Sequence, residues 1–475
     1  MKNRTLIRAA VSTLAMVVLT WPGALPEARA ADDDRPAYHV LRQNEDWSFL
    51  ADHEGETDLF DPIKYIPLTD DGQLWMSLGG QIRERLEGWN DNVFGQPAGS
   101  DPDDVLLLSR FLFHGDVHMT DMFRVFVQGK SSLSTRTNLD ARNRKLDRDQ
   151  IDLQNAFGEI AVPIDDVHVR LRGGREELLF GKQRLVSPLD WANTRRTFDG
   201  VNARVKAGRW STTGFWTKPV QVKKNSFNKN GNDFYGLYAT ATDLVGLDGL
   251  DLYWLDLDRG QRTFNGTTGS ETRHTLGVRA WGGVRDTSVY YDGEFAYQFG
   301  DVGSADVNAF MITGLVGTKL DFGWLTPKVE AGFGYASGDD NPGDNDVETF
   351  NQLFPLGHAY LGYIDVVGRQ NIIDMRLSSF FDVFFDIGGK LDFHYFWRAD
   401  DDDALYNAGG GVVRAGNLGS SNDVGAELDL TFKRALTKHL KAIFGYSHFF
   451  AGDFIEQSGP DDDIDFVHVT LQLTI

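Results

Sequence analysis

Apolar and polar residues alternate along most of the chain. In the stretch 465–475, Val467 and Leu471 lie on an apolar face, whereas His468 and Thr470 lie on a polar one. Alternation with a period of two is typical of β-strands that have one apolar face. Segments of this kind begin near Leu74, Val105, Met122, Ile151, Val167, Phe198, Trp210, Asp233, Leu250, Thr272, Ser288, Asp306, Thr326, Gln370, Asp386, Asp423, Lys438 and Ile464. The pattern therefore predicts an all-β fold with eighteen strands.

Most predicted strands are long enough to cross a membrane, which takes about 9–11 residues for a tilted strand. The connections between them alternate between short turns and long loops. The short turns cover 119–123, 206–210 and 434–440, and the long polar loops cover 131–150, 175–197, 219–232, 259–271, 337–369 and 399–422. This is the layout of an outer-membrane barrel. We therefore expect a transmembrane antiparallel β-barrel over residues 74–475, with short periplasmic turns and long extracellular loops.

A soluble β-sandwich, β-helix or propeller, such as a secreted polysaccharide lyase or epimerase, would also show alternation. Two features of the faces favour a membrane barrel instead. Charged residues occur on the second face of nearly every predicted strand, and the apolar face is rich in aromatic residues, as expected at membrane interfaces. A β-helix would also show a repeat of about 20–30 residues, and we find none. Glu84 is an exception, because it falls on an apolar face.

The first residues have the pattern of a secretory signal peptide. Basic residues precede an apolar run at 9–20, and Ala-Arg-Ala at 28–30 matches a cleavage site, so we expect a signal peptide over 1–30. Residues 31–73 lack alternation and are predicted to form a periplasmic segment. The chain has no cysteine and a net charge of −22, which argues against disulfides and against nucleic-acid binding. These features indicate an exported protein of the bacterial outer membrane.

If the apolar faces contact lipid, the polar faces line the lumen of the barrel. The cations expected there are Arg83, Arg85, Arg110, Arg124, Arg170, Arg172, Arg204, Arg279, Arg376 and Arg398. The acids expected there are Glu87, Asp292, Glu294, Asp374, Glu427 and Asp429. The planar guanidinium pairs well with carboxylates, so these arginines favour an anion-accepting pathway. The alternative is that arginines and acids form ladders that only brace the lumen.

Two long loops are expected at or over the pore. The first covers 174–197, and its candidate gating residues are Arg175, Glu177, Arg195 and Arg196. It contains no nucleophile motif and no carboxylate pair at a defined spacing, so we do not expect an enzyme. The second, 337–369, is rich in acids. A structural calcium ion bound by Asp339, Asp340, Asp344 and Asp346 is one hypothesis for this loop, although its spacing does not match an EF-hand. No other cofactor is expected.

Several stretches together resemble the alginate-export family of bacterial outer-membrane porins. They are "LGGQIRERLEGW" (78–89), "GREELLFGKQRLVSPLDWANTRRTFDGV" (174–201), "RHTLGVRAWG" (273–282), "ASGDDNPGDNDVETFNQLFPLGHAYLGYIDVVGRQNI" (336–372), "DALYNAGGGVVR" (403–414) and "GAELDLTFKRALTKHLKAIFGYSHFFAGDFI" (425–455). The resemblance implies an eighteen-stranded barrel and an arginine-rich interior through which an acidic polysaccharide such as alginate, or its oligomers, would pass.

The expected function is thus a passive outer-membrane channel, because no energy-coupling motif is found. Its expected partners are an anionic polysaccharide, outer-membrane lipid and lipopolysaccharide, and periplasmic secretion proteins, and we expect a monomer. A porin for small anionic nutrients is the alternative within the same architecture.

Overall fold

The computed structural model describes residues 36–53, 58–96, 101–135, 144–223, 229–230, 232–323, 325–416 and 421–475. The predicted signal peptide, residues 1–30, lies outside these ranges. None of the helices within them has the length and apolar character needed to span a bilayer.

The described part of the chain contains eighteen long strands. They are β2 (Leu74–Asn90), β3 (Asp104–Met119), β4 (Phe123–Ser134), β5 (Asp149–Ile164), β6 (Val167–Glu176), β7 (Phe198–Ala207), β8 (Trp210–Gln221), β10 (Asp233–Leu244), β11 (Leu247–Phe264), β12 (Thr267–Gly283), β13 (Tyr290–Val302), β14 (Ala305–Lys319), β15 (Lys328–Ala336), β17 (Ile372–Val383), β18 (Ile387–Trp397), β21 (Asp423–Ala435), β22 (Leu440–Ala451) and β23 (Ile464–Thr474). Short strands are β1 (Ile66–Pro67), β9 (Lys229–Asn230), β16 (Asp346–Val347), β19 (Leu405–Tyr406) and β20 (Val412–Arg414).

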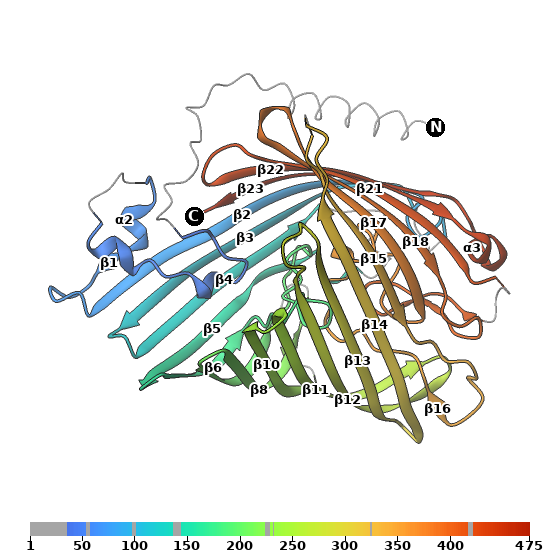
Figure 1. Cartoon of the computed structure of the whole chain (residues 1–475), viewed down its shortest axis with the longest axis horizontal. Coiled ribbons are helices and arrows are strands. Elements are labelled where there is room, and N and C mark those ends of the chain that lie inside the picture. Colours follow the sequence, from blue (N-terminus) through green and yellow to red (C-terminus); the bar gives the residue numbers. More distant parts are fainter. Residues whose placement is uncertain are drawn as a thin grey trace.

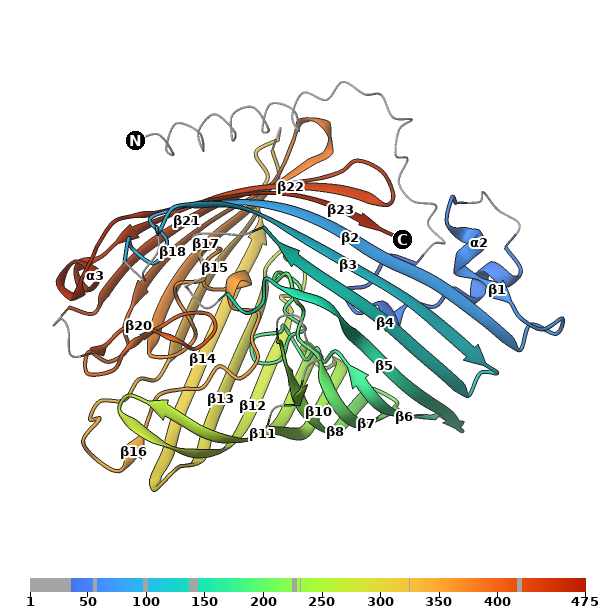
Figure 2. The ribbon, with the colours of Figure 1, turned by 180° about the vertical axis from the view of Figure 1, so that it is seen from behind.

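Each long strand pairs antiparallel with the next, and β23 pairs with β2, so the sheet closes into a barrel (Figure 1). The predicted barrel and its strand number are confirmed. Short turns gather at one end, which we call the turn end, beside α2 (Asp61–Lys64) and β1. Long connections, with β16 and α3 (Asp453–Ser458), gather at the opposite end, which we call the loop end (Figure 2).

The prediction of a long loop at 259–271 is wrong. The strands β11 and β12 continue through this region as one long hairpin, with Arg262 opposite Gly269 and Phe264 opposite Thr267. The chain reverses at Asn265 and Gly266, which both have positive φ (40° and 96°). Asn-Gly is the sequence that a tight two-residue hairpin turn prefers, because such a turn needs positive φ at both positions. The polar residues of this stretch therefore belong to a hairpin that projects at the loop end.

Outward-facing positions carry the apolar residues that the alternation predicted. Leu237, Leu252 and Leu276 on neighbouring strands are exposed on the outer face, as lipid contact requires. Glu84 is outward-facing too, since it alternates with the buried, inward-facing Arg83 and Arg85 on β2. Its carboxylate accepts a hydrogen bond of 2.5 Å from the Ser109 hydroxyl on β3. The exception seen in the sequence is thus a polar pair on the outer wall.

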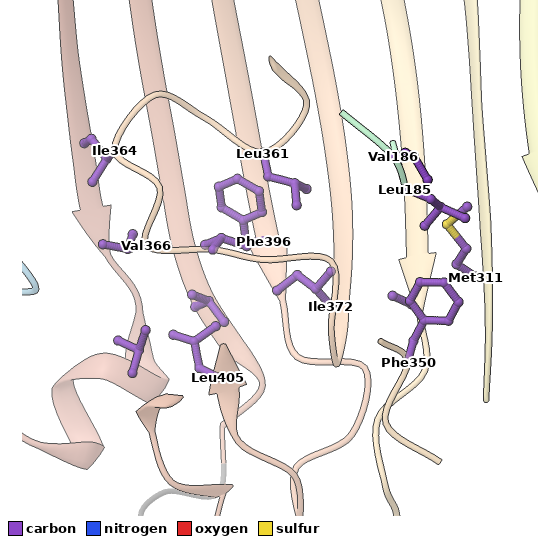
Figure 3. Packing of buried hydrophobic residues seen from close by; sticks show 14 of the residues in the cluster. Leu185, Val186, Met311, Phe350, Leu361, Ile364, Val366, Ile372, Phe396 and Leu405 are labelled. Carbon is purple, nitrogen blue, oxygen red and sulfur yellow. The ribbon is translucent and has the colours of Figure 1, made fainter. Parts of the chain in front are cut away.

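The hydrophobic core lies inside the barrel. It is formed where two connections that fold into the lumen meet inward-facing residues of the wall (Figure 3). Leu185 and Phe350 from these connections pack near Met311 of β14, and Leu361 packs near Phe396 of β18. Burial of apolar surface contributes roughly 25 cal/mol per Å², so this contact holds the connections in place.

The segment before β2 lies at the turn end. It contains η1 (Arg42–Asn44), η2 (Ser48–Ala51), α2 and β1, and β1 pairs with the start of β2. The Arg42 guanidinium donates to the carbonyls of Gly80 (3.0 Å) and Ile475 (2.6 Å). His439, in the turn between β21 and β22, lies 2.8 Å from the Asp58 carboxylate. The predicted N-terminal segment therefore packs against the barrel.

Candidate functional site

Two connections occupy the lumen, and we call them the first inward loop (177–197, between β6 and β7) and the second inward loop (337–371, between β15 and β17). Backbone hydrogen bonds join them: Phe354 N–H donates to Leu185 O (2.8 Å), and Ser187 N–H donates to Phe354 O (2.9 Å). The two loops predicted to lie at or over the pore therefore form one element inside the barrel.

Arg196 joins the two loops a second time. Its guanidinium donates to the Ser187 carbonyl at 2.9 Å and also to the carbonyls of Phe354 and Pro355. It also lies over the Phe354 ring, 5.4 Å from the centroid. Because one guanidinium presents five donors in a fixed plane, it can hold several carbonyls of two segments at once. Arg196 thus joins the two loops as a staple, and its gating role stays a prediction.

Three of the predicted lumen arginines anchor the turn 190–192 of the first inward loop. Arg83 donates to the carbonyls of residues 190 and 192 at 2.8 and 2.9 Å, and Arg110 donates to the same two carbonyls at 2.8 and 3.0 Å. Arg85 donates to the carbonyl of Trp191 at 2.7 Å and lies over its ring. All three side chains are buried. Their donors are therefore used by the protein itself.

Ion pairs complete this anchor. Arg110 also binds the Asp190 carboxylate at 2.8 Å, and Arg195 lies between Asp190 and Glu177 at 3.1 and 2.6 Å. Burial opposes ionisation of Asp190, but Arg110 and Arg195 outweigh it and hold the pKa of this carboxyl below its usual value. Of the candidate gating residues, Glu177 and Arg195 thus brace the loop base.

Three further acids of the wall have partners of the same kind. Glu87 forms ion pairs with Arg85 and with Arg144, each at 2.9 Å. Arg172 on β6 binds Glu159 at 2.5 Å and Glu176 at 3.0 Å. These pairs fit the bracing ladder that the sequence left open as an alternative.

The facing wall holds the first inward loop through acids. Arg184 of this loop reaches Asp292 and Glu294 on β13, each at 2.8 Å. Arg279 on β12 shares Asp292 at 2.5 Å and binds Asp251 on β11 at 2.8 Å. The predicted residues Asp292, Glu294 and Arg279 are thus brought together, with Arg184 as the cation at their centre.

Longer contacts hold the second inward loop against β15 and β17. Arg376 lies 3.6 Å from Glu330 and donates to the Ala359 carbonyl at 3.3 Å. Asp374 lies 3.8 Å from Arg369. These distances exceed those of the ion pairs around the first inward loop.

Four of the predicted cations, Arg124, Arg170, Arg172 and Arg204, line open cavities at the turn end. One cavity of about 510 Å³ is bounded by Arg124, Arg170 and Arg204 and by residues 43–46 of the N-terminal segment. A second, of about 170 Å³, is bounded by Arg170, Arg172, Arg204 and the base of the first inward loop. Arg124 is paired with Asp116 at 2.6 Å, but Arg204 is exposed and its Nε donates to the neutral Ser211 hydroxyl.

Two of the predicted site residues do not line the lumen. Arg175 belongs to β6 and pairs with Asp199 at 2.6 Å, on the face of β7 that also carries the exposed Val201. Arg398 follows the end of β18, and its guanidinium donates to the carbonyls of Asp401 and Asp403 in the next loop, at 2.7 and 3.0 Å. β6 continues to Glu176, so Arg175 belongs to this strand and not to the loop in which it was predicted, and Arg398 is bound by the loop that follows β18.

The acidic tip of the second inward loop does not assemble as predicted. Asp339 is buried, whereas Asp340, Asp344 and Asp346 are exposed. Among the described residues, the groups whose ligand atoms converge are Asp392, His394 and Asp429 in the wall, and three exposed aspartates at 400–402. Calcium at the four predicted aspartates therefore remains a prediction without a converged ligand set. Burial, together with nearby Asp403, raises the pKa of Asp339 to about 7.

Trp191 and Arg144 are contributors that the sequence did not identify. Trp191 packs with His358 (4.2 Å between ring centroids) and with Tyr363 and His468. The signal was present, because a tryptophan beside Asp190 in a polar loop needs a buried partner.

The fold is shared with solved outer-membrane proteins of Pseudomonas aeruginosa. The outer membrane protein OpdK aligns with a TM-score of 0.57 and 11% identity, over 84% of this chain and 98% of OpdK. OccK2 (OpdF) aligns with a TM-score of 0.56 and 12% identity, over 86% of this chain and 99% of OccK2. A further structure of OccK2, in complex with glucuronate, aligns with a TM-score of 0.55 and 12% identity, over 84% and 98%. No curated protein matches this sequence.

A closed barrel of this architecture with inward loops defines a channel protein of the bacterial outer membrane. The model of the alginate export family matches residues 74–467, which is most of the chain. The chain therefore belongs to the alginate export family, and the predicted family is confirmed. The barrel fold and the family support a channel, and they identify the turn end as periplasmic.

Proposed function

We propose that this protein is a passive channel for an anionic saccharide. The saccharide enters or leaves the channel through the cationic cavities at the periplasmic end. The observation that carries the proposal is that Arg170 and Arg204 line these cavities, with Arg204 exposed and Arg170 half-buried, and that within the described residues neither guanidinium donates to a loop carbonyl. A uronate carries one carboxylate per sugar, which a guanidinium binds through two parallel hydrogen bonds.

Moderate binding suits such a pathway. A channel must let its solute leave, so several weak contacts serve better than one tight site. Arg170 lies 3.7 Å from Glu159, and Arg124 is bound to Asp116, so acids beside the cations lower their attraction for a passing carboxylate. The family match supports an acidic polysaccharide such as alginate as the solute class.

The test is charge reversal of Arg170 and Arg204, measured in planar lipid bilayers. We expect R170E/R204E to lose most of the anion preference seen in the reversal potential, and to lose block by polyuronate. The matched control is R209E/R285E, which changes the net charge equally at exposed turn residues that line neither cavity. Equal reversal potentials in both double variants would contradict the proposal.

A porin for small anions is the second candidate, and the joined inward loops favour it. They fill part of the lumen and are bound to both walls, as the contacts of Arg110 and Arg184 show. The structure of OccK2 with glucuronate concerns a single uronate on a barrel of the same fold. Uronate oligomers of increasing length distinguish the candidates: a polymer channel is blocked more strongly by longer oligomers, whereas a small-anion porin is blocked best by the monomer.

A further inference from the structure

Three metal-ligating side chains converge on the inner wall between β18 and β21. Asp392 and His394 are two residues apart on β18, and Asp429 lies directly opposite Asp392 on β21. One ligand atom from each of the three lies within 4.8 Å of the others. All three residues are buried, with 1–2% exposure. Strand pairing therefore fixes this group, because residues two apart share a face and opposed residues lie side by side.

The group carries more negative charge than its neighbours compensate. Glu427, opposite His394, adds a third buried carboxylate. Lys390 binds Oδ2 of Asp392 at 2.5 Å. Arg376 lies opposite His394 on β17, but its guanidinium is directed to Glu330 and to the Ala359 carbonyl. Among the described residues, Lys390 is the lysine or arginine that forms an ion pair with one of these three acids, and Lys433 lies near Asp392 as well.

Polar atoms within the group also lack partners. Oδ1 of Asp392 and Nδ1 of His394 are buried without a hydrogen bond among the described residues, and so is Oε2 of Glu427. The shortest approach between the imidazole and Asp429 is 3.8 Å, from Nε2 to Oδ2. Buried polar groups are normally paired, and an unpaired one costs about 1–3 kcal/mol. Asp392 and His394 thus each carry an unpaired buried atom, and both belong to the group whose ligand atoms converge.

We propose that Asp392, His394 and Asp429 bind a divalent transition-metal ion of the Zn²⁺ or Mn²⁺ type. Two carboxylate oxygens and one imidazole nitrogen are a ligand set that such ions accept, whereas Ca²⁺ and Mg²⁺ prefer oxygen alone. The ion neutralises the charge of two carboxylates, and Asp392 offers Oδ1 while Oδ2 stays with Lys390. The remaining coordination positions are available to water or to Glu427.

The site is coupled to the second inward loop. Oε1 of Glu427 accepts the backbone N–H of Ile364 at 2.9 Å, and Gly362 packs directly on this carboxylate. A bound cation beside Glu427 lowers the repulsion among the acids under the loop. Metal binding should therefore stabilise the loop in the lumen, and the assignment itself does not depend on which solute the channel carries.

The experiment uses the tag-free full chain in detergent, treated with a chelator and then titrated with Co²⁺ and Zn²⁺. We expect one Co²⁺ per chain with visible d–d absorption, and displacement by Zn²⁺ in calorimetry. H394Q and D392N should each weaken binding by more than about tenfold, as loss of a ligand does. The control D401N/D402N removes exposed aspartates that lack an imidazole, and should bind like the wild type.

Gel migration checks the folding of each variant independently, because an unheated, folded barrel migrates differently from the same protein after heating. D392N keeps the shape of the side chain, so it reports on the ligand rather than on packing. Absence of Co²⁺ absorption in the folded wild type would overturn the proposal, because protons then satisfy the group. Equal affinity in the wild type, H394Q and D392N would overturn it too, since the ions would be bound elsewhere.

Discussion

Arginines in two parts of the lumen wall have opposite surroundings. On β2 and β3, Arg83 and Arg110 are buried, and the turn 190–192 takes their donors. On β6 and β7, Arg170 and Arg204 line cavities and keep exposed guanidinium surface. Both groups are inward-facing and both alternate with apolar residues. The difference shows that a loop already uses the donors of some inward cations, whereas others line open cavities.

The largest effect is expected from removing an anchor. R110M should lower the free energy of unfolding by about 3 kcal/mol or more, because it removes several hydrogen bonds of one buried guanidinium, each worth about 1.5–3 kcal/mol, to Asp190, to the carbonyl of residue 192 and to Gln81. The loop should also leave the wall, so single-channel conductance should rise. Urea unfolding in lipid vesicles and bilayer recordings measure both effects. R204M is the control, and a loss of stability as large as that of R110M would remove the distinction between the two groups.

A smaller effect is expected at the staple between the loops. R196M removes the donor to three carbonyls, and we expect a loss of about 1.5–3 kcal/mol, as for hydrogen bonds from a charged group. Separation of the loops should also expose them to protease in intact vesicles. R209M, at an exposed turn, should leave cleavage unchanged. If R196M is cleaved no faster than the wild type, the loops do not depend on each other.

The position of the second inward loop should depend on pH through Asp339. Its pKa of about 7 lies above the value of about 3.9 in an unfolded chain, so the folded state binds the extra proton. The docked loop should therefore become less stable as pH rises from about 4 to about 7, and change little above that. Protease cleavage of this loop should be faster at pH 8 than at pH 5.5 in the wild type. D339N should remove the difference, whereas D344N, at an exposed site, should keep it.

The smallest change in stability is expected from removing the two cavity arginines, although their removal should change ion selectivity strongly. R170A/R204A should change the free energy of unfolding by no more than about 0.5 kcal/mol, because neither residue anchors a loop. Its anion preference should nevertheless fall clearly in reversal-potential measurements. A marked loss of stability would mean that these arginines are structural, like those of β2 and β3.

Most of the barrel could be predicted from the sequence, because lipid on one side and a polar lumen on the other impose a period of two. The exceptions are local. At 259–271, polar residues suggested a loop, but the Asn265-Gly266 turn lets the hairpin run on. At the strand ends, the pattern did not show that β6 runs on to Glu176 and so includes Arg175, or that loop carbonyls bind Arg398.

The roles of the lumen residues could be predicted only in part. Alternation placed Arg83, Arg85 and Arg110 on the inner face, but their partners are carbonyls of residues 190–192, more than seventy positions away. Backbone carbonyls leave no trace in a sequence, so nothing marks the arginines that bind them. The same holds for Asp392 and His394, whose meeting with Asp429 depends on strand register.

The contact of Arg42 with Ile475 has a consequence for biogenesis. The pairing of β2 with β23 joins segments from opposite ends of the barrel sequence, so it is the slowest contact to find and the natural last step of closure. Arg42 donates both to Gly80 on β2 and to the carbonyl of Ile475, next to β23. The N-terminal segment can make both bonds only after the seam has formed. The docked N-terminal segment therefore stabilises the closed barrel, because β2 and β23 can separate only if these two hydrogen bonds break.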